Sequence, residues 1–265
     1  MKNIILEKTV IFLFFFIFLL VGLSIFKDYG ISIDEDNTRI VGFLSLEYIL
    51  NHFSFFENKV EISNLIKENA GAHPKDEIST SGIVFDLPMA FVEYFYGIKD
   101  SRNYFLLRHL VTFLIFFSST FFFYLLLKNK FKSVFYALLG TSFLIISPRI
   151  FANSFYNSKD IIFMSLFIIS LFYSLRFLKS KDILNGFILS IIYALAINLR
   201  IIGIIFPIIL TIFYLIKILM ENRNYKNKIL NYLFFITSLV FTIYLITPEL
   251  WVDTVDSFLK LVLFL

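Results

Sequence analysis

The stretch TVIFLFFFIFLLVGLSIF, residues 9–26, contains 18 residues and no charged side chain. A helix needs about 17 to 25 apolar residues to cross a hydrocarbon layer of ~30 Å, so this stretch is long enough for one crossing. Lys2 and Lys8 precede it, as in a signal peptide, but no cleavage site of the A-x-A type follows. We therefore expect an uncleaved first membrane span.

Further apolar blocks follow along the chain, and hydrophobic residues make up 58% of its 265 residues, against about 45–50% in soluble domains. The block at 183–219 is too long for one crossing, because a helix of that length would extend roughly 55 Å. Asn198 and Arg200 lie at its middle, so we expect two short helices that turn between 198 and 203. The predicted fold is all-α, a polytopic transmembrane helix bundle of about seven spans at 9–26, 110–127, 134–147, 161–175, the two halves of 183–219, and 229–247.

The distribution of basic residues predicts the orientation of these spans. With seven spans, the short loops on the side of the N-terminus hold eleven Lys and Arg, whereas the short loops on the opposite side hold three. We therefore expect a cytoplasmic N-terminus. The long segment 27–108 then forms a large external first loop.

Two amphipathic helices are predicted inside this loop. The first covers 38–53, where apolar residues recur at helical spacing after Asp36 and Asn37 as candidate caps. The second covers 87–96, which opens with an acid and a proline and closes at Gly97. Helices of this kind lie on a membrane surface or cover a cavity.

Three acids follow the first span in the sequence Gly30-Ile-Ser-Ile-Asp-Glu-Asp36. Helix capping in a solvated loop accounts for acids at this position, and Asp36 is the best candidate for a cap. The alternative is that Asp34 or Glu35 faces a cavity at membrane level as a general base, because desolvation makes a carboxylate more basic. Both interpretations remain open at the level of sequence.

A second polar cluster is the segment 147–160, which we expect to be a short external loop between two spans. Arg149 and Lys159 are suited to binding a phosphate. The alternative is that both side chains extend to the lipid headgroups. Arg108 and Arg200, near other span ends, are further candidates, because a cation at membrane depth is costly unless it is paired or faces water.

Composition excludes several kinds of site. The chain has no cysteine, which excludes disulfides, thiolate catalysis and cysteine-based metal sites. His52, His73 and His109 lack the close spacing of metal ligands, so no histidine-based metal site is expected. The net charge of +4 comes from basic residues between spans, and we expect no nucleic acid partner.

In their order and topology, these features resemble the GT-C superfamily of integral membrane glycosyltransferases, which includes protein O-mannosyltransferases and aminoarabinose transferases. Members have a cytoplasmic N-terminus, a large first external loop with surface helices, and an acidic motif just after the first span, which Asp34-Glu35 matches. The resemblance covers the whole chain, 1–265, as a single transmembrane module. Three later segments are similar to those of bacterial members: Ser147-Pro-Arg to Asn-Ser-Lys-Asp160, Ala-Ile-Asn-Leu-Arg200-Ile-Ile-Gly203 and Thr247-Pro-Glu-Leu-Trp251.

The resemblance implies transfer of a sugar, with inversion, from a polyprenyl-phosphate-linked donor to a lipid, glycan or protein acceptor. The site would face outward in a bacterial inner membrane, among membrane lipids. Asp34 would be the base, and Glu35 would orient it, contact the acceptor or help hold a divalent metal ion. The candidates for neutralising the departing phosphate, strongest first, are Arg149 and Lys159, then Arg108 and Arg200. Members usually continue through several more spans, so we expect the chain to be truncated at its C-terminus.

Two other classes of protein are compatible with the pattern. A transporter or flippase of an anionic lipid-linked substrate could use the same cations, although repeated halves and helices broken at the midplane are more typical of transporters. Here the polar residues cluster at one external level instead. A non-catalytic membrane protein is the second alternative.

Overall fold

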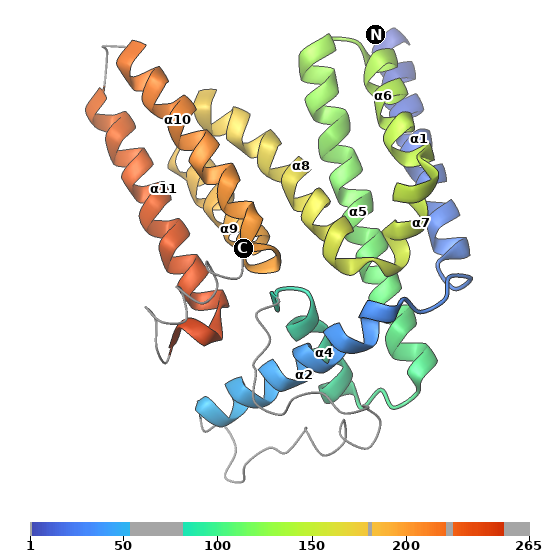
Figure 1. Ribbon diagram of the computed structural model, residues 1–265. Coiled ribbons are helices and arrows are strands. Elements are labelled where there is room, and N and C mark those ends of the chain that lie inside the picture. Colours follow the sequence, from blue (N-terminus) through green and yellow to red (C-terminus); the bar gives the residue numbers. More distant parts are fainter. Residues whose placement is uncertain (1, 54–81, 180–181, 221–224, 252–265) are drawn as a thin grey trace. The chain divides into compact units, whose positions relative to one another are not determined.

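The computed structural model describes residues 2–53, 82–179, 182–220 and 225–251, and every regular element in these ranges is a helix (Figure 1). Five helices in these ranges are long and apolar enough to cross a membrane, or six if one bent pair counts as a span. The chain is therefore a multi-pass integral membrane protein, as its composition predicts. It divides into two compact units, Met1–Glu35 with Lys99–Phe172 and Asp36–Ile98 with Tyr173–Leu265.

The first unit contains α1 (Lys2–Ile25), α5 (Ser101–Phe131), α6 (Val134–Ile146), α7 (Pro148–Tyr156) and most of α8 (Ser158–Lys179). Phenylalanine rings fill the space between α1 and α5, where Phe18 and Phe113 meet edge to face with centroids 5.6 Å apart. Gly22 allows this approach, because a Cβ there would lie 1.8 Å from the Phe113 ring. The apolar block predicted at 110–127 is confirmed as part of α5, and the one predicted at 9–26 is confirmed as part of α1 up to Ile25.

A bend of 65° separates α6 from α7. Pro148 is the first residue of α7, and because proline has no N–H to donate to the preceding turn, α6 ends at Ile146. The sequence predicts a connecting loop at 147–160, and this prediction is wrong. Nine of those residues form α7, and Ser158 already begins α8.

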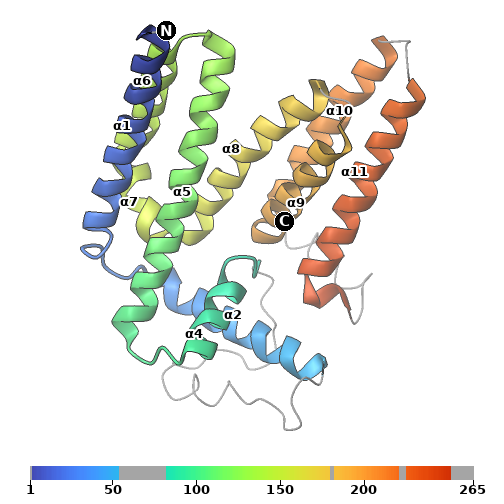
Figure 2. The same ribbon diagram turned by 180° about the vertical axis from the view of Figure 1, so that it is seen from behind.

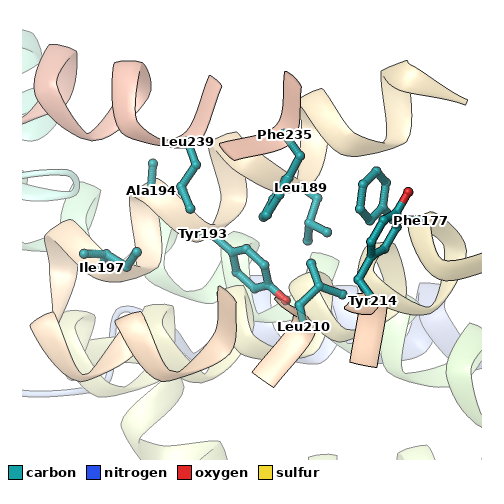
Figure 3. Close-up of a cluster of buried hydrophobic side chains, with 9 residues drawn as sticks. All are labelled: Phe177, Leu189, Tyr193, Ala194, Ile197, Leu210, Tyr214, Phe235 and Leu239. Carbon is teal, nitrogen blue, oxygen red and sulfur yellow. The ribbon is translucent and has the colours of Figure 1, made fainter. Parts of the chain in front are cut away.

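The second unit contains α2 (Ile33–His52) from its fourth residue, α4 (Asp86–Tyr96), α9 (Ile183–Leu199), the 3-10 helix η1 (Ile201–Ile204), α10 (Ile205–Met220), α11 (Tyr225–Ile246) and the 3-10 helix η2 (Pro248–Trp251). The helices α9, α10 and α11 lie side by side, as seen from behind in Figure 2. Figure 3 shows their shared apolar core, in which Phe177 and Tyr214 stack with centroids 5.2 Å apart. Tyr193 and Phe235 complete the aromatic part of this core.

The long apolar block at 183–219 is broken where the sequence predicts a turn. The helix α9 ends at Leu199, Arg200 has an extended backbone, and α10 begins at Ile205 after one 3-10 turn. The predicted division into two helices is therefore confirmed.

The two helices predicted in the segment after the first span also exist. Gly97, with φ of 63°, ends α4 in the left-handed conformation, as predicted. The helix α2 begins at Ile33, five residues before the predicted start, so Asp36 and Asn37 lie inside it and are not its caps. Arg39 of α2 forms an ion pair with the buried Glu93 of α4, with Nε 3.0 Å from both carboxylate oxygens.

Candidate functional site

Glu35 organises the start of α2 in the first unit. It is the third residue of the helix, and its Oε2 accepts a hydrogen bond of 2.7 Å from the backbone N–H of Ser32, the residue before the helix. This is half of a capping box, in which an acid three residues into a helix satisfies the N–H at its start. The spacing Ser-x-x-Glu was present in the sequence, so Glu35 and not Asp36 could have been assigned as the capping acid.

The second carboxylate oxygen of Glu35 contacts α5. Glu35 Oε1 lies 3.0 Å from Nε2 of His109, and the two side chains are only 4% and 1% exposed. With the imidazole protonated this contact is a buried ion pair, and breaking such a pair is strongly destabilising because one charge is left uncompensated. The pair therefore fixes the first turn of α2 against α5. Nothing in the sequence pointed to this contact, because the two residues are far apart along the chain.

Arg108 precedes His109 and lies deeper in its helix than the sequence predicts. The apolar block begins at 110, which placed Arg108 at the opening of a span. Instead α5 begins at Ser101, so Arg108 lies in its third turn, with 2% of its surface exposed. Arg108 is thus a buried cation next to His109 in the sequence, and not a surface cation at a span end.

Asp34 is an exposed acid beside the buried Glu35. It precedes Glu35 in the first turn of α2, and its side chain faces solvent while that of Glu35 is buried. A carboxylate in this position is accessible to a substrate. The capping bond and the ion pair of Glu35 hold the backbone that carries Asp34.

The chain that connects α1 to α2 lies against the end of α7. The ring of Tyr29 stacks on Phe155 with centroids 4.4 Å apart, and the Tyr156 ring lies 6.1 Å away. The pKa of Tyr29 is raised, mainly because burial disfavours the phenolate and further because of Tyr156 and Asp28. The first unit therefore brings the chain between α1 and the acidic motif against the end of α7, although these two segments are far apart in the sequence.

The two cations of that segment lie at opposite ends of α7. Arg149 is exposed in the first turn of α7, and Lys159 is half-buried in the first turn of α8. Between them, Asn157 caps α8: its Oδ1 accepts from the N–H of Asp160 at 3.0 Å, and its Nδ2 donates to Asp160 Oδ2 at 3.1 Å. Asn157 and Asp160, which the sequence assigned to a polar loop, therefore stabilise the junction between α7 and α8.

Arg200 lies in the second unit, exposed, between α9 and η1. Its neighbour Asn198 has a structural role that the sequence did not reveal. Asn198 Oδ1 accepts hydrogen bonds from the backbone N–H groups of Ile83 and Val84, at 3.0 and 3.1 Å. Its Nδ2 donates to Ile246 O and Thr247 Oγ1, at 3.2 and 3.0 Å. One amide in the last turn of α9 thus joins the segment before α4 to the end of α11.

In the ranges that the structure describes, no three His, Asp or Glu side chains form a group that could hold a metal ion. Glu35, which the family resemblance offered as a metal ligand, is engaged by His109. His73 lies outside the described residues. The divalent metal ion therefore remains a prediction without an assigned set of ligands.

No family model, curated protein or solved structure matches the chain. Its resemblance to the GT-C transferases consequently remains a prediction.

Proposed function

We propose that this protein is a membrane glycosyltransferase of the GT-C type, which transfers a sugar from a polyprenyl-phosphate-linked donor to an acceptor with inversion. One observation carries the proposal. At the exit of the first apolar helix, the exposed Asp34 is held by a buried neighbour, Glu35, which is both hydrogen-bonded and ion-paired. An accessible carboxylate on a fixed backbone can reach the proton of an acceptor, which is the geometric requirement for a general base, although Asp34 is exposed and not desolvated in a cavity as the sequence hypothesis had it.

In the proposed topology, seven helices cross the membrane and the N-terminus is cytoplasmic. Five of them are the long apolar helices α1, α5, α8, α10 with η1, and α11, and the other two are the bent pair α6–α7 and the shorter apolar helix α9. The excess of Lys and Arg on the side of the N-terminus supports this orientation. Asp34, at the opposite end of α1, then faces the outer side, where the acceptor is expected.

In the proposed reaction, Asp34 removes a proton from the acceptor hydroxyl or amine as that group attacks the anomeric carbon of the sugar. The bond from this carbon to the phosphate oxygen breaks, and the polyprenyl phosphate leaves. A cation that meets the growing negative charge lowers the barrier. We assign this role to Lys159, because the Tyr29–Phe155 stack holds the chain that leads to Asp34 against the end of α7 that precedes Lys159. Arg149 lies at the far end of α7.

The decisive substitution is Asp34→Asn. It should lower the release of polyprenyl phosphate from membranes supplied with donor and acceptor by about 10²-fold, which is typical for loss of a general base. Asp36→Asn is the matched control, because Asp36 is exposed two residues further along α2. Equal losses in the two variants, at equal protein levels, would refute Asp34 as the base. Movement of the intact donor across the membrane, without sugar transfer, would favour a flippase.

A further inference from the structure

The bend between α6 and α7 leaves an apolar cavity of about 550 Å³ against α1 in the first unit. Pro148 causes the bend, since it cannot donate the hydrogen bond that would continue α6. The cavity lies between Val21 on α1, Ile146 at the end of α6, and Pro148. Its volume falls within the roughly 300–1,000 Å³ of ligand sites.

The lining of this cavity excludes polar ligands. Its walls are apolar apart from Ser142, and the hydroxyl of Ser142 donates to the carbonyl oxygen of Leu138 at 2.9 Å. No side chain in the lining is therefore available to bind a sugar or a charged group. Because α1 from Thr9 onward and the whole of α6 carry no charged side chain, the surroundings of the cavity are lipid hydrocarbon.

We infer that this cavity binds one acyl chain of a bilayer phospholipid whose phosphate pairs with Arg149. The exposed Arg149 directly follows Pro148 and supplies the charge that complements a phosphate. An apolar lining cannot discriminate among hydrocarbon chains, so mass action favours the most abundant lipid of the membrane. The inference goes beyond the proposed transferase activity and does not depend on it, because the donor phosphate is assigned to Lys159.

The test is native mass spectrometry of the whole chain purified in mild detergent. Val21→Trp should fill the cavity, whereas Leu23→Trp lies about 200° further round α1 and serves as the control. The two positions are similarly exposed, at 43% and 39%, and close in depth. We expect one phospholipid on the wild type and on the control, and at least a tenfold lower occupancy in Val21→Trp. Arg149→Gln should lower the occupancy as well.

A second variant covers the case in which Val21→Trp does not fold. Ile146→Trp fills the cavity from α6, at a position that is 72% exposed. Loss of the phospholipid in either folded filling variant, but not in the control, supports the site. Equal occupancy in wild type, filling variants and control overturns it. Retention of a polyprenyl phosphate in place of a phospholipid also overturns it.

Discussion

At the scale of single residues, Glu35 combines two interactions of different strength. Its hydrogen bond to Ser32 is a helix cap, which is worth about 1 kcal/mol. Its contact with His109 is buried and is an ion pair when the imidazole is protonated, and removal of one partner of such a pair costs about 3–5 kcal/mol. The comparison favours the ion pair as the main contribution of Glu35.

This difference predicts the effects of two substitutions. Glu35→Gln keeps an oxygen that can accept from Ser32 but removes the charge, whereas Glu35→Ala removes both interactions. If the ion pair dominates, the two variants should be destabilised by similar amounts, about 3 kcal/mol each. Thermal unfolding in detergent provides the measurement. A glutamine variant as stable as the wild type, beside a destabilised alanine variant, would assign the contribution to the cap.

Lys159 should act on the phosphate of the donor in the proposed reaction. Lys159→Gln is expected to weaken donor binding and to lower turnover still further, because the phosphate gains charge only as it leaves. Lys27→Gln is the control, since Lys27 is exposed after α1 and has no proposed role. Binding of a polyprenyl-phosphate donor to protein in nanodiscs and the transfer rate give the two quantities. Unchanged values in Lys159→Gln would remove this residue from the site.

At the scale of helices, the sequence predicted the helices that lie in apolar blocks. It did not predict the helical structure of the polar segments at the ends of these blocks. The break at Arg200 followed from the length of its apolar block, which no single helix fits into a bilayer, and from the polar residues Asn198 and Arg200 at its middle. The helix α7 was missed because its polar residues suggest a loop, although Ile150, Phe151 and Phe155 have helical spacing. The depth of Arg108 was missed because a helix can begin well before its apolar block.

The segment before α4 depends on a glycine at its contact with α9. A Cβ on Gly82 would lie 1.7 Å from the carbonyl oxygen of Asn198, so Gly82→Ala must displace this segment. The hydrogen bonds from Ile83 and Val84 to Asn198 would then be lost, at about 1–3 kcal/mol for each N–H left unsatisfied. Thermal unfolding should show a clear loss of stability.

Two comparisons make this prediction specific. Asn198→Ala removes the same hydrogen bonds from the other side, so its destabilisation should be at least as large. Gly30→Ala should be harmless, because no atom lies within 4 Å of a Cβ at that position. Equal stability of the Gly82 and Gly30 variants would show that the contact with Asn198 contributes little.

At the scale of the whole molecule, composition and charge predicted the class of protein. They did not predict which residues of the candidate site contact one another. Hydrophobicity alone was enough to predict a multi-pass membrane protein. Contacts such as Glu35–His109 and Tyr29–Phe155 join segments that are distant in sequence, and one sequence carries no signal for such pairs. The proposed location of Asp34 on the outer side still depends on the charge asymmetry.

The orientation can be measured at the two ends of α5. Lys99 precedes this helix and Asn129 lies near its end; both are exposed, and 30 residues of helix span about 45 Å. Because the chain has no cysteine, Lys99→Cys and Asn129→Cys each introduce a single reactive thiol. In intact cells, an impermeant maleimide should label Lys99→Cys, whereas Asn129→Cys should require permeabilisation. The reverse pattern would place the N-terminus outside and Asp34 in the cytoplasm, which would contradict the proposed transferase at the outer face.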